Sequence, residues 1–264
     1  MDPFRSFDAA MLRAEHLLKL YDMVCDSAER DANVKWAAGF KASINWPAQA
    51  EVSRVYGKDR KSILIFQRSI GVDRSHFSHT YASELLRAAL VASVSALDRC
   101  MHDLIVKYIW QTKDWFERED MPRELRELSI PLHEVFAAVR KAREPGSKPG
   151  ALVRKVLQEQ LTRKTFQSPD DVAAALRILG IKDVWGRLAL ELGGDGKART
   201  ASARLQAICK RRNQIVHEAD LELRIKASTP TLRDIGADQA RADIAWMRSL
   251  GEAIRTVVTR HLNT

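Results

Sequence analysis

The sequence has little cysteine and no long apolar run. Its three cysteines, Cys25, Cys100 and Cys209, are odd in number and are not spaced as metal ligands, which argues against a disulfide framework or a zinc site. The longest apolar-rich stretch without a charge, residues 88–97, is too short to cross a bilayer, and residues 1–5 contain no apolar signal core. We therefore expect a soluble, cytoplasmic protein with no membrane partner.

Acidic residues are outnumbered by basic ones. The chain of 264 residues carries 43 Lys and Arg against 34 Asp and Glu, which gives a formal net charge of +9 and a pI of about 9.6. Such an excess favours a polyanionic partner, although lysines scattered over a surface would give the same total. The length suits one domain with an extension, or two small domains.

Motifs for metals and cofactors are also missing. The glycine-rich residues 193–196 follow a helical segment and lack the ending of a phosphate-binding loop, so we interpret them as a linker. His76 and His79 are spaced as a pair but have no further ligands near them in the sequence. We therefore predict no metal and no cofactor. Tryptophans at helical core positions indicate packing rather than base stacking: Trp110, Trp185 and Trp246.

Most of the chain shows the periodicity of amphipathic helices. The clearest is a long helix over residues 81–110, where apolar residues line one broad face. Ser168 and Pro169, followed by two acidic residues, are typical of a helix start. Further helices are expected over residues 7–24, 131–141, 152–161, 183–192 and 205–219. Between residues 35 and 71 the pattern is weak, and residues 63–66 could form a short strand or a buried turn.

The helix expected over residues 205–219 combines an apolar stripe with groups that can act on a phosphodiester. Arg212 falls within the stripe. Asn213 and His217 are four residues apart, which makes them neighbours on one helix face, and Lys210 lies on the same face. The stripe itself consists of Leu205, Ile208, Cys209, Ile215, Val216 and Ala219.

RNA cleavage needs this set of groups. The ribose 2′-hydroxyl attacks the adjacent phosphorus, so a base must take its proton, an acid must protonate the leaving 5′-oxygen, and a cation must stabilise the non-bridging oxygens. A histidine such as His217 can be acid or base at cellular pH. Arginine, here Arg212, stays charged and binds phosphate with two N–H groups. One histidine does not readily serve in both roles, so a two-fold dimer is expected to supply a second.

Other interpretations of these residues stay open. An arginine five positions before a histidine arises by chance in many helices. Arg212 could be a structural arginine that pairs with a buried carboxylate, for which Asp98 and Asp103 are the candidates by pattern. His217 could be a helix-end histidine that the helix dipole favours.

The segment 211–217, Arg-Arg-Asn-Gln-Ile-Val-His, resembles the R-N-x-x-x-H signature of the HEPN superfamily. Residues 86–90, 94–99 and 103–105 resemble the first bundle helix of its RiboL-PSP-HEPN group, in which an acidic residue commonly stands near the position of Asp98. Two further similarities lie at residues 161–185 and in the helix expected over residues 240–258. Together they cover about residues 80–262, roughly two thirds of the chain.

The resemblance implies an all-α fold, with a HEPN-type four-helix bundle over residues 76–264 and inserted helices within it. Residues 1–75 would form a mostly helical N-terminal extension. Members of this superfamily dimerise, and many cut single-stranded RNA or a tRNA loop without a metal. They often act as toxins or in antiviral defence. The expected partners are therefore RNA, such as tRNA or mRNA, a second copy of the chain, and an antitoxin or defence-system protein.

The residues and the resemblance together suggest roles. His217 would be the acid or base, Arg212 the phosphate stabiliser, Asn213 the group that orients the imidazole and Asp98 a partner of Arg212. RNA would be held by Lys210, Arg211, Lys197 and Arg199. The alternative is a catalytically inactive HEPN module that binds RNA, a nucleotide or a protein partner. A basic helical DNA-binding protein is a third hypothesis, although no helix-turn-helix spacing stands out.

Overall fold

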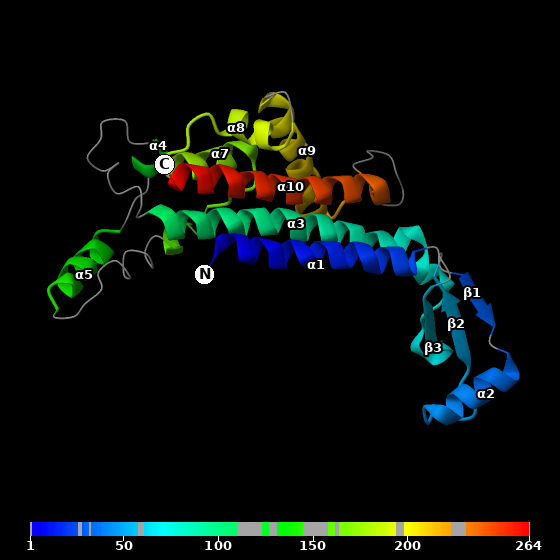
Figure 1. Ribbon diagram of the computed structural model, residues 1–264. Coiled ribbons are helices and arrows are strands. Elements are labelled where there is room, and N and C mark those ends of the chain that lie inside the picture. Colours follow the sequence, from blue (N-terminus) through cyan, green and yellow to red (C-terminus); the bar gives the residue numbers. More distant parts are fainter. Residues whose placement is uncertain are drawn as a thin grey trace.

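The protein is mostly helical, with a small antiparallel sheet near one end (Figure 1). The computed structural model describes residues 2–25, 28–31, 33–57, 61–109, 123–126, 131–144, 158–161, 164–193, 198–222 and 231–263. Over these residues, no helix has both the length and the apolar character needed to span a membrane. The expected helical character is confirmed, but the sheet is an addition that an all-α assignment did not contain.

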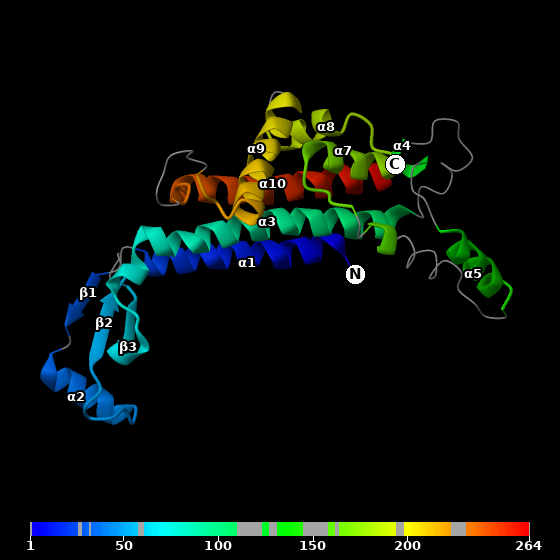
Figure 2. The same ribbon diagram turned by 180° about the vertical axis from the view of Figure 1, so that it is seen from behind.

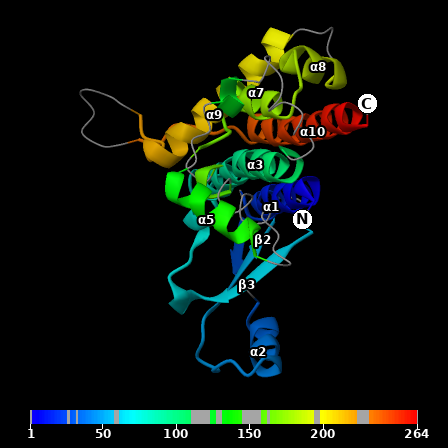
Figure 3. The same ribbon diagram turned by 90° about the vertical axis from the view of Figure 1, so that its left-hand side faces the viewer.

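Three long helices form the centre of the molecule: α1 (Pro3–Val24), α3 (His79–Tyr108) and α10 (Ala237–Leu262). Figure 3 shows α3 between α1 and α10. The shorter helices α7 (Pro169–Ile178), α8 (Val184–Glu191) and α9 (Ala198–His217) cover the other side of this layer, and α9 runs across α3 and α10 (Figure 2). One apolar core joins all six helices, because each places fully buried side chains in it.

Helix α1 belongs to this core rather than to a separate extension. Its Phe7 and Met11 are almost completely buried, and Phe7 lies where a side chain on Gly251 of α10 would stand. The boundary expected at residue 75 therefore does not separate α1 from the bundle. A ladder of ion pairs with a seven-residue repeat joins the two antiparallel helices: Asp8 with Arg255, Glu15 with Arg248 and Asp22 with Arg241.

The rest of the N-terminal part forms a small unit of sheet and helix. Strands β1 (Ala28–Asp31), β2 (Val52–Tyr56) and β3 (Ile63–Gln67) pair antiparallel in that order. Helix α2 (Val34–Ser43) lies between β1 and β2 in sequence. Residues 63–66 thus form the strand that the sequence left open against a buried turn. Two 3-10 turns, Arg68–Ile70 and Arg74–Phe77, lead from β3 into α3.

The helices expected from periodicity are found with shifts of a few residues at their ends. Helix α7 begins as predicted, since the Ser168 side chain accepts from the backbone N–H of Asp171 and Pro169 occupies the first turn. Helix α9 begins at Ala198, seven residues before the predicted start, because its first two turns are too polar to show a stripe. Of the helix expected over 152–161, the described residues 158–161 are helical. Trp110 lies outside the described residues.

Two helices remain at the end of the molecule opposite the sheet: α4 (Arg123–Arg126) and α5 (Leu132–Ala142). Helix α5 stands apart from the bundle in both Figure 1 and Figure 2. It agrees closely with the helix predicted over residues 131–141.

Candidate functional site

One exposed stripe of α9 carries most of the side chains expected to contact RNA. Arg199, Lys210, Asn213 and His217 are all exposed, and their successive spacings of eleven, three and four residues place them along one side of the helix. At 1.5 Å per residue the stripe from Arg199 to His217 is about 27 Å long. Lys197, the remaining cation expected beside it, lies outside the described residues.

Arg212 lies at the edge of this stripe with its charge turned to solvent. Its stem is half-buried, and its Nε atom is covered and has no hydrogen-bond partner. One terminal nitrogen donates to Oδ1 of Asn213 at 3.0 Å. No carboxylate of the described chain pairs with Arg212, so its charge stays available to an anion.

The inner part of Arg212 lies near a buried thiol. Burial raises the pKa of Cys209 to about 12, and the positive charge of Arg212 opposes that shift. The sequence placed Arg212 in the apolar stripe, and the structure agrees for the stem only. The guanidinium fork reaches the surface, where it meets Asn213.

Arg211, the preceding residue, has a different environment. Both of its terminal nitrogens donate to the carboxylate of Asp220, one of them at 2.8 Å to Oδ2. A third bond from the same side chain reaches the backbone oxygen of Asp234 at 3.3 Å. Arg211 therefore shares the Asp220 carboxylate with the fold, and its side chain is 22% exposed. Its expected role as an RNA contact stays a prediction, and the structure gives it a structural contact as well.

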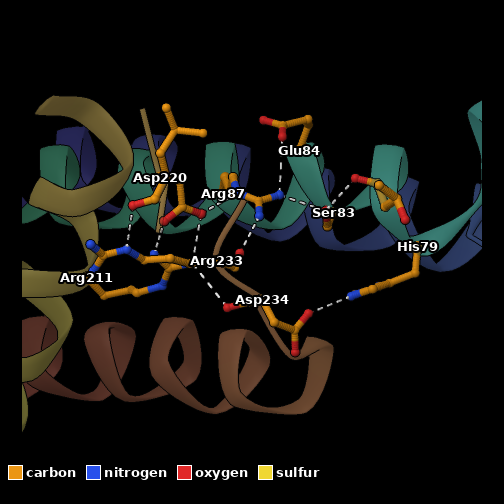
Figure 4. A network of polar contacts seen from close by, with 10 residues as sticks. His79, Ser83, Glu84, Arg87, Arg211, Asp220, Arg233 and Asp234 are labelled. Atoms are coloured by element: carbon orange, nitrogen blue, oxygen red, sulfur yellow. Dashed lines mark hydrogen bonds and ion pairs between the residues drawn. The ribbon is translucent and has the colours of Figure 1, made fainter. Parts of the chain in front are cut away.

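Asp220 is the centre of a buried ionic network that links α9 to α3 (Figure 4). Its Oδ2 also accepts from Nε of Arg87 at 2.5 Å, and both side chains are almost completely buried. Arg87 further donates to Ser83 Oγ at 2.7 Å and to the backbone oxygen of Arg233 at 2.7 Å. We refer to Arg87, Arg211 and Asp220 as the Asp220 clamp.

The two arginines keep this carboxylate ionised. Burial raises the pKa of Asp220, but the hydrogen bonds from Arg211 and Arg87, together with their charges, outweigh burial. The pKa of Asp220 therefore lies below its ordinary value. The clamp is a charged unit inside the fold at neutral pH.

The chain brings Asp220 to this place by an abrupt turn at the end of α9. Ala219 and Asp220 both have left-handed backbones, with φ of 49° and 55°. The N–H of Asp220 donates back to the carbonyl of Gln214 at 3.0 Å, which closes the helix end. The N–H of Arg233 then donates to the carbonyl of Asp220 at 2.7 Å, and an isolated bridge joins Leu221 to Leu232.

Arg233 and Asp234, which follow this turn in the chain, lie beside the Asp220 clamp. Arg233 pairs with Glu218 at 3.0 Å and donates to the carbonyl of Leu221. Asp234 accepts from, or pairs with, His79 at 3.3 Å, and the other ring nitrogen of His79 lies 2.9 Å from the hydroxyl of Tyr21.

Asp98 does not pair with Arg212. Its carboxylate accepts from the backbone N–H of Phe166 at 2.5 Å and lies 3.8 Å from Nε2 of His102. Burial lowers the pKa of His102, and the charge of Asp98 opposes that effect. The face of α3 that carries Asp98 therefore meets the segment before α7 rather than α9. Asp103, the other candidate, pairs with Arg99 at 2.9 Å.

His217 is the last residue of α9 and is exposed. Within the described residues its imidazole makes no hydrogen bond that would orient it. Arg212, Asn213 and His217 thus lie within two turns of one helix end, on the solvent side, while the neighbouring Arg211 points into the protein.

Comparisons with protein-family models, with curated proteins and with solved structures give no match.

Proposed function

We propose that this chain is a metal-independent endoribonuclease of the HEPN type, with its active site at the end of α9. One observation carries the proposal. Of two consecutive arginines, Arg211 is paired with a buried aspartate, while Arg212 is held by the uncharged Asn213 four residues before His217. A cation that has a neutral partner retains the full attraction for a phosphate.

The reaction follows from these groups. His217 acting as base takes the proton of the ribose 2′-hydroxyl, and the oxygen attacks the adjacent phosphorus as the bond to the 5′-oxygen breaks. An imidazolium donates a proton to that leaving oxygen. Arg212 binds the non-bridging oxygens, on which charge develops, and Asn213 holds its guanidinium in place. The products are a 2′,3′-cyclic phosphate and a 5′-hydroxyl.

Two histidines are needed for the two proton transfers, and one α9 end supplies one. A two-fold homodimer that sets two α9 ends against each other would supply both. Val216, next to His217, is 45% exposed, and such a contact would cover it. Sedimentation velocity on the purified chain tests this part of the proposal, and a dimer is the expected species.

The exposed stripe of α9 would guide the RNA to the cleavage site. Lys210 lies two helical turns before His217, and Arg199 lies about three turns further back. Both would meet phosphates of one single strand, in tRNA or mRNA. Cutting cellular RNA suits a toxin or an antiviral-defence effector in the cytoplasm, with an antitoxin or defence-system protein as a further partner.

A second function is supported by the unoriented imidazole. A base normally has its second ring nitrogen fixed by a neighbour, and within one subunit His217 has none in the described chain. The alternative is therefore an inactive module of the same type, which would bind RNA, a nucleotide or a protein through this face.

Incubation of the purified protein with total RNA in EDTA separates the two. We expect fragments whose 3′ ends carry 2′,3′-cyclic phosphate, since the reaction needs no metal. Intact RNA under conditions in which the protein is folded and binds RNA would overturn the nuclease and leave the binding module.

A further inference from the structure

The small N-terminal unit has no evident part in folding the bundle. We refer to residues 33–57 and 61–77, which contain α2, β2 and β3, as the appendage. It projects from the end of the long helices in Figures 1, 2 and 3, with α2 farthest from the bundle. Neither apolar core cluster of the described chain includes an appendage residue, and no residue of α2 is buried.

Charge and aromatic rings are concentrated in this part of the sequence. Residues 33–77 contain eight Lys and Arg against three Asp and Glu, a net charge of +5 out of the +9 of the whole chain. Six of the 18 aromatic residues lie in the same 45 positions. A segment that is both basic and aromatic, and that does not build the core, is typical of a nucleic-acid contact.

The aromatic rings of the appendage form a column with an arginine inside it. Trp36 and Phe40 are stacked, with centroids 5.1 Å apart and planes at 9°. The guanidinium of Arg54, on β2, lies 4.7 Å from the Trp36 ring and 5.7 Å from the Tyr56 ring. Trp46 meets Phe40 edge-on at 5.7 Å. The column ties α2 to the sheet through planar groups.

Backbone contacts hold the column in place. The side chain of Asn33 caps α2 by accepting from the N–H groups of Lys35 and Trp36. Lys41 donates to the carbonyls of Ala48 and Ala50, which fixes the loop that carries Trp46. A preorganised aromatic surface loses little freedom when a ligand binds.

Part of the column is exposed to solvent. Trp36 retains 38% of its surface, although Phe40 and Arg54 contact it, and Val34 on the same helical turn is 83% exposed. Lys35, between them, is exposed as well. A large ring, an aliphatic group and a cation therefore stand together on the first turn of α2.

We propose that the appendage is a second binding surface, which holds single-stranded RNA away from the α9 site. Bases stack on aromatic and guanidinium planes, and Lys35 meets a phosphate of the same strand. A single strand fits because its base faces are free, whereas a duplex hides them. The choice of RNA rather than DNA rests on the proposed function; the surface itself does not depend on cleavage.

The test is a binding titration with the full-length chain, followed by fluorescence anisotropy. The probe is a fluorescein-labelled 2′-O-methyl uridine 20-mer, which 2′-hydroxyl attack cannot cut, so binding is measured whether or not the protein is a nuclease. We expect Trp36→Ala to weaken binding by about 5- to 150-fold, the loss that removal of a base-stacking contact gives. Trp36→Phe, which keeps a ring, should retain most of the affinity.

Lys35→Gln tests the surface without removing a packed ring. It should lower the slope of log K against log salt by about 0.7, the value for one phosphate contact on a single strand. Phe136→Ala is the control, because Phe136 is 64% exposed on α5, at the opposite end of the molecule. Wild-type affinity of Trp36→Ala, an unchanged salt slope for Lys35→Gln, or no binding by the wild-type chain would each overturn the proposal. The last result would favour a protein partner instead.

Discussion

Arg87 on α3 and Asp220 after α9 form a buried ion pair across 133 positions of the chain, with 2.5 Å between Nε and Oδ2. The same carboxylate holds Arg211, which stands immediately before the Arg212 of the candidate site. The Asp220 clamp therefore fixes the end of α9 against α3. It determines which of the two arginines enters the protein and which one faces solvent.

Asp220→Ala should be strongly destabilising. It removes the buried counter-charge of Arg87, which keeps only the exposed Glu84 at 3.2 Å, and removal of one partner of a buried ion pair costs about 3–5 kcal/mol in the free energy of unfolding. Urea unfolding measures the change. Asp238→Ala is the matched control, since that side chain is fully exposed and should leave the unfolding curve near that of the wild type. Equal curves for the two variants would mean that the clamp does not form.

The same pair predicts a pH dependence. The pKa of Asp220 is lower in the folded chain than in the unfolded one, where an aspartate titrates at about 3.9. The clamp therefore stabilises the fold fully above that pH, and its contribution is lost as the pH falls through the lower, folded pKa. The difference in unfolding free energy between wild type and Asp220→Asn should be constant near neutral pH and should shrink below about pH 4. A difference that stays constant down to about pH 2 would contradict the ionised clamp.

Arg211 and Arg212 should respond in opposite ways to the same substitution. Arg212→Ala should lower RNA cleavage by about 10²- to 10³-fold, the usual effect of removing one charge stabiliser, with little change in melting temperature. Arg211→Ala should lower the melting temperature, because it breaks the clamp. Cleavage rates at a temperature where both variants are folded, together with melting curves, test the assignment. An Arg212 variant that cleaves normally would remove that residue from the mechanism.

Two glycines test whether α1 belongs to the bundle. Gly251→Ala would drive a methyl group into the ring of Phe7, which is 1% exposed and has no room to move. Overpacking of this kind costs about 1–3 kcal/mol, which outweighs the better helix propensity of alanine. Gly39→Ala in α2 meets nothing within 4 Å, so propensity alone acts and stability should be kept or raised. Chemical denaturation compares the two, and a stabilised Gly251 variant would mean that Phe7 packs elsewhere.

Local signals in the sequence predicted the helical framework well. Ser168 and Pro169 specify the start of α7 through interactions within one turn, and the long apolar face of α3 is continuous in the chain. The positions of Asn213 and His217 on one exposed face of α9 also followed from spacing alone. Such features depend on neighbours three or four residues away, which a single sequence contains.

Contacts between distant segments could not be predicted from such local patterns. Asp98 was expected beside Arg212 because both lie on inward-turned faces, but periodicity does not say which helix a face meets, and Asp98 caps the N–H of Phe166 instead. Arg87 gave one signal that was overlooked, a charge between the buried Leu86 and Leu90. No pattern in the sequence indicated its partner Asp220, because Asp220 reaches Arg87 through a left-handed turn after α9.

The appendage shows a different limit. Between residues 35 and 71 the strands are short and the burial pattern is incomplete, so neither helical nor strand periodicity dominates. The aromatic column joins Trp36 on α2 to Arg54 on β2, and it appears only once the sheet has paired. Composition alone would have marked this region, since its excess of basic and aromatic residues is plain in the sequence.

The most direct measurement of the central claim is the RNA cleavage rate of His217→Ala beside that of His133→Ala, in EDTA and on one RNA substrate. His133 is also an exposed helical histidine, with 82% of its side chain accessible, but it lies on α5 far from α9. We predict that His217→Ala loses about 10²- to 10⁴-fold in rate at an unchanged melting temperature, while His133→Ala cleaves at the wild-type rate. Equal rates for the two variants would contradict an active site at the end of α9.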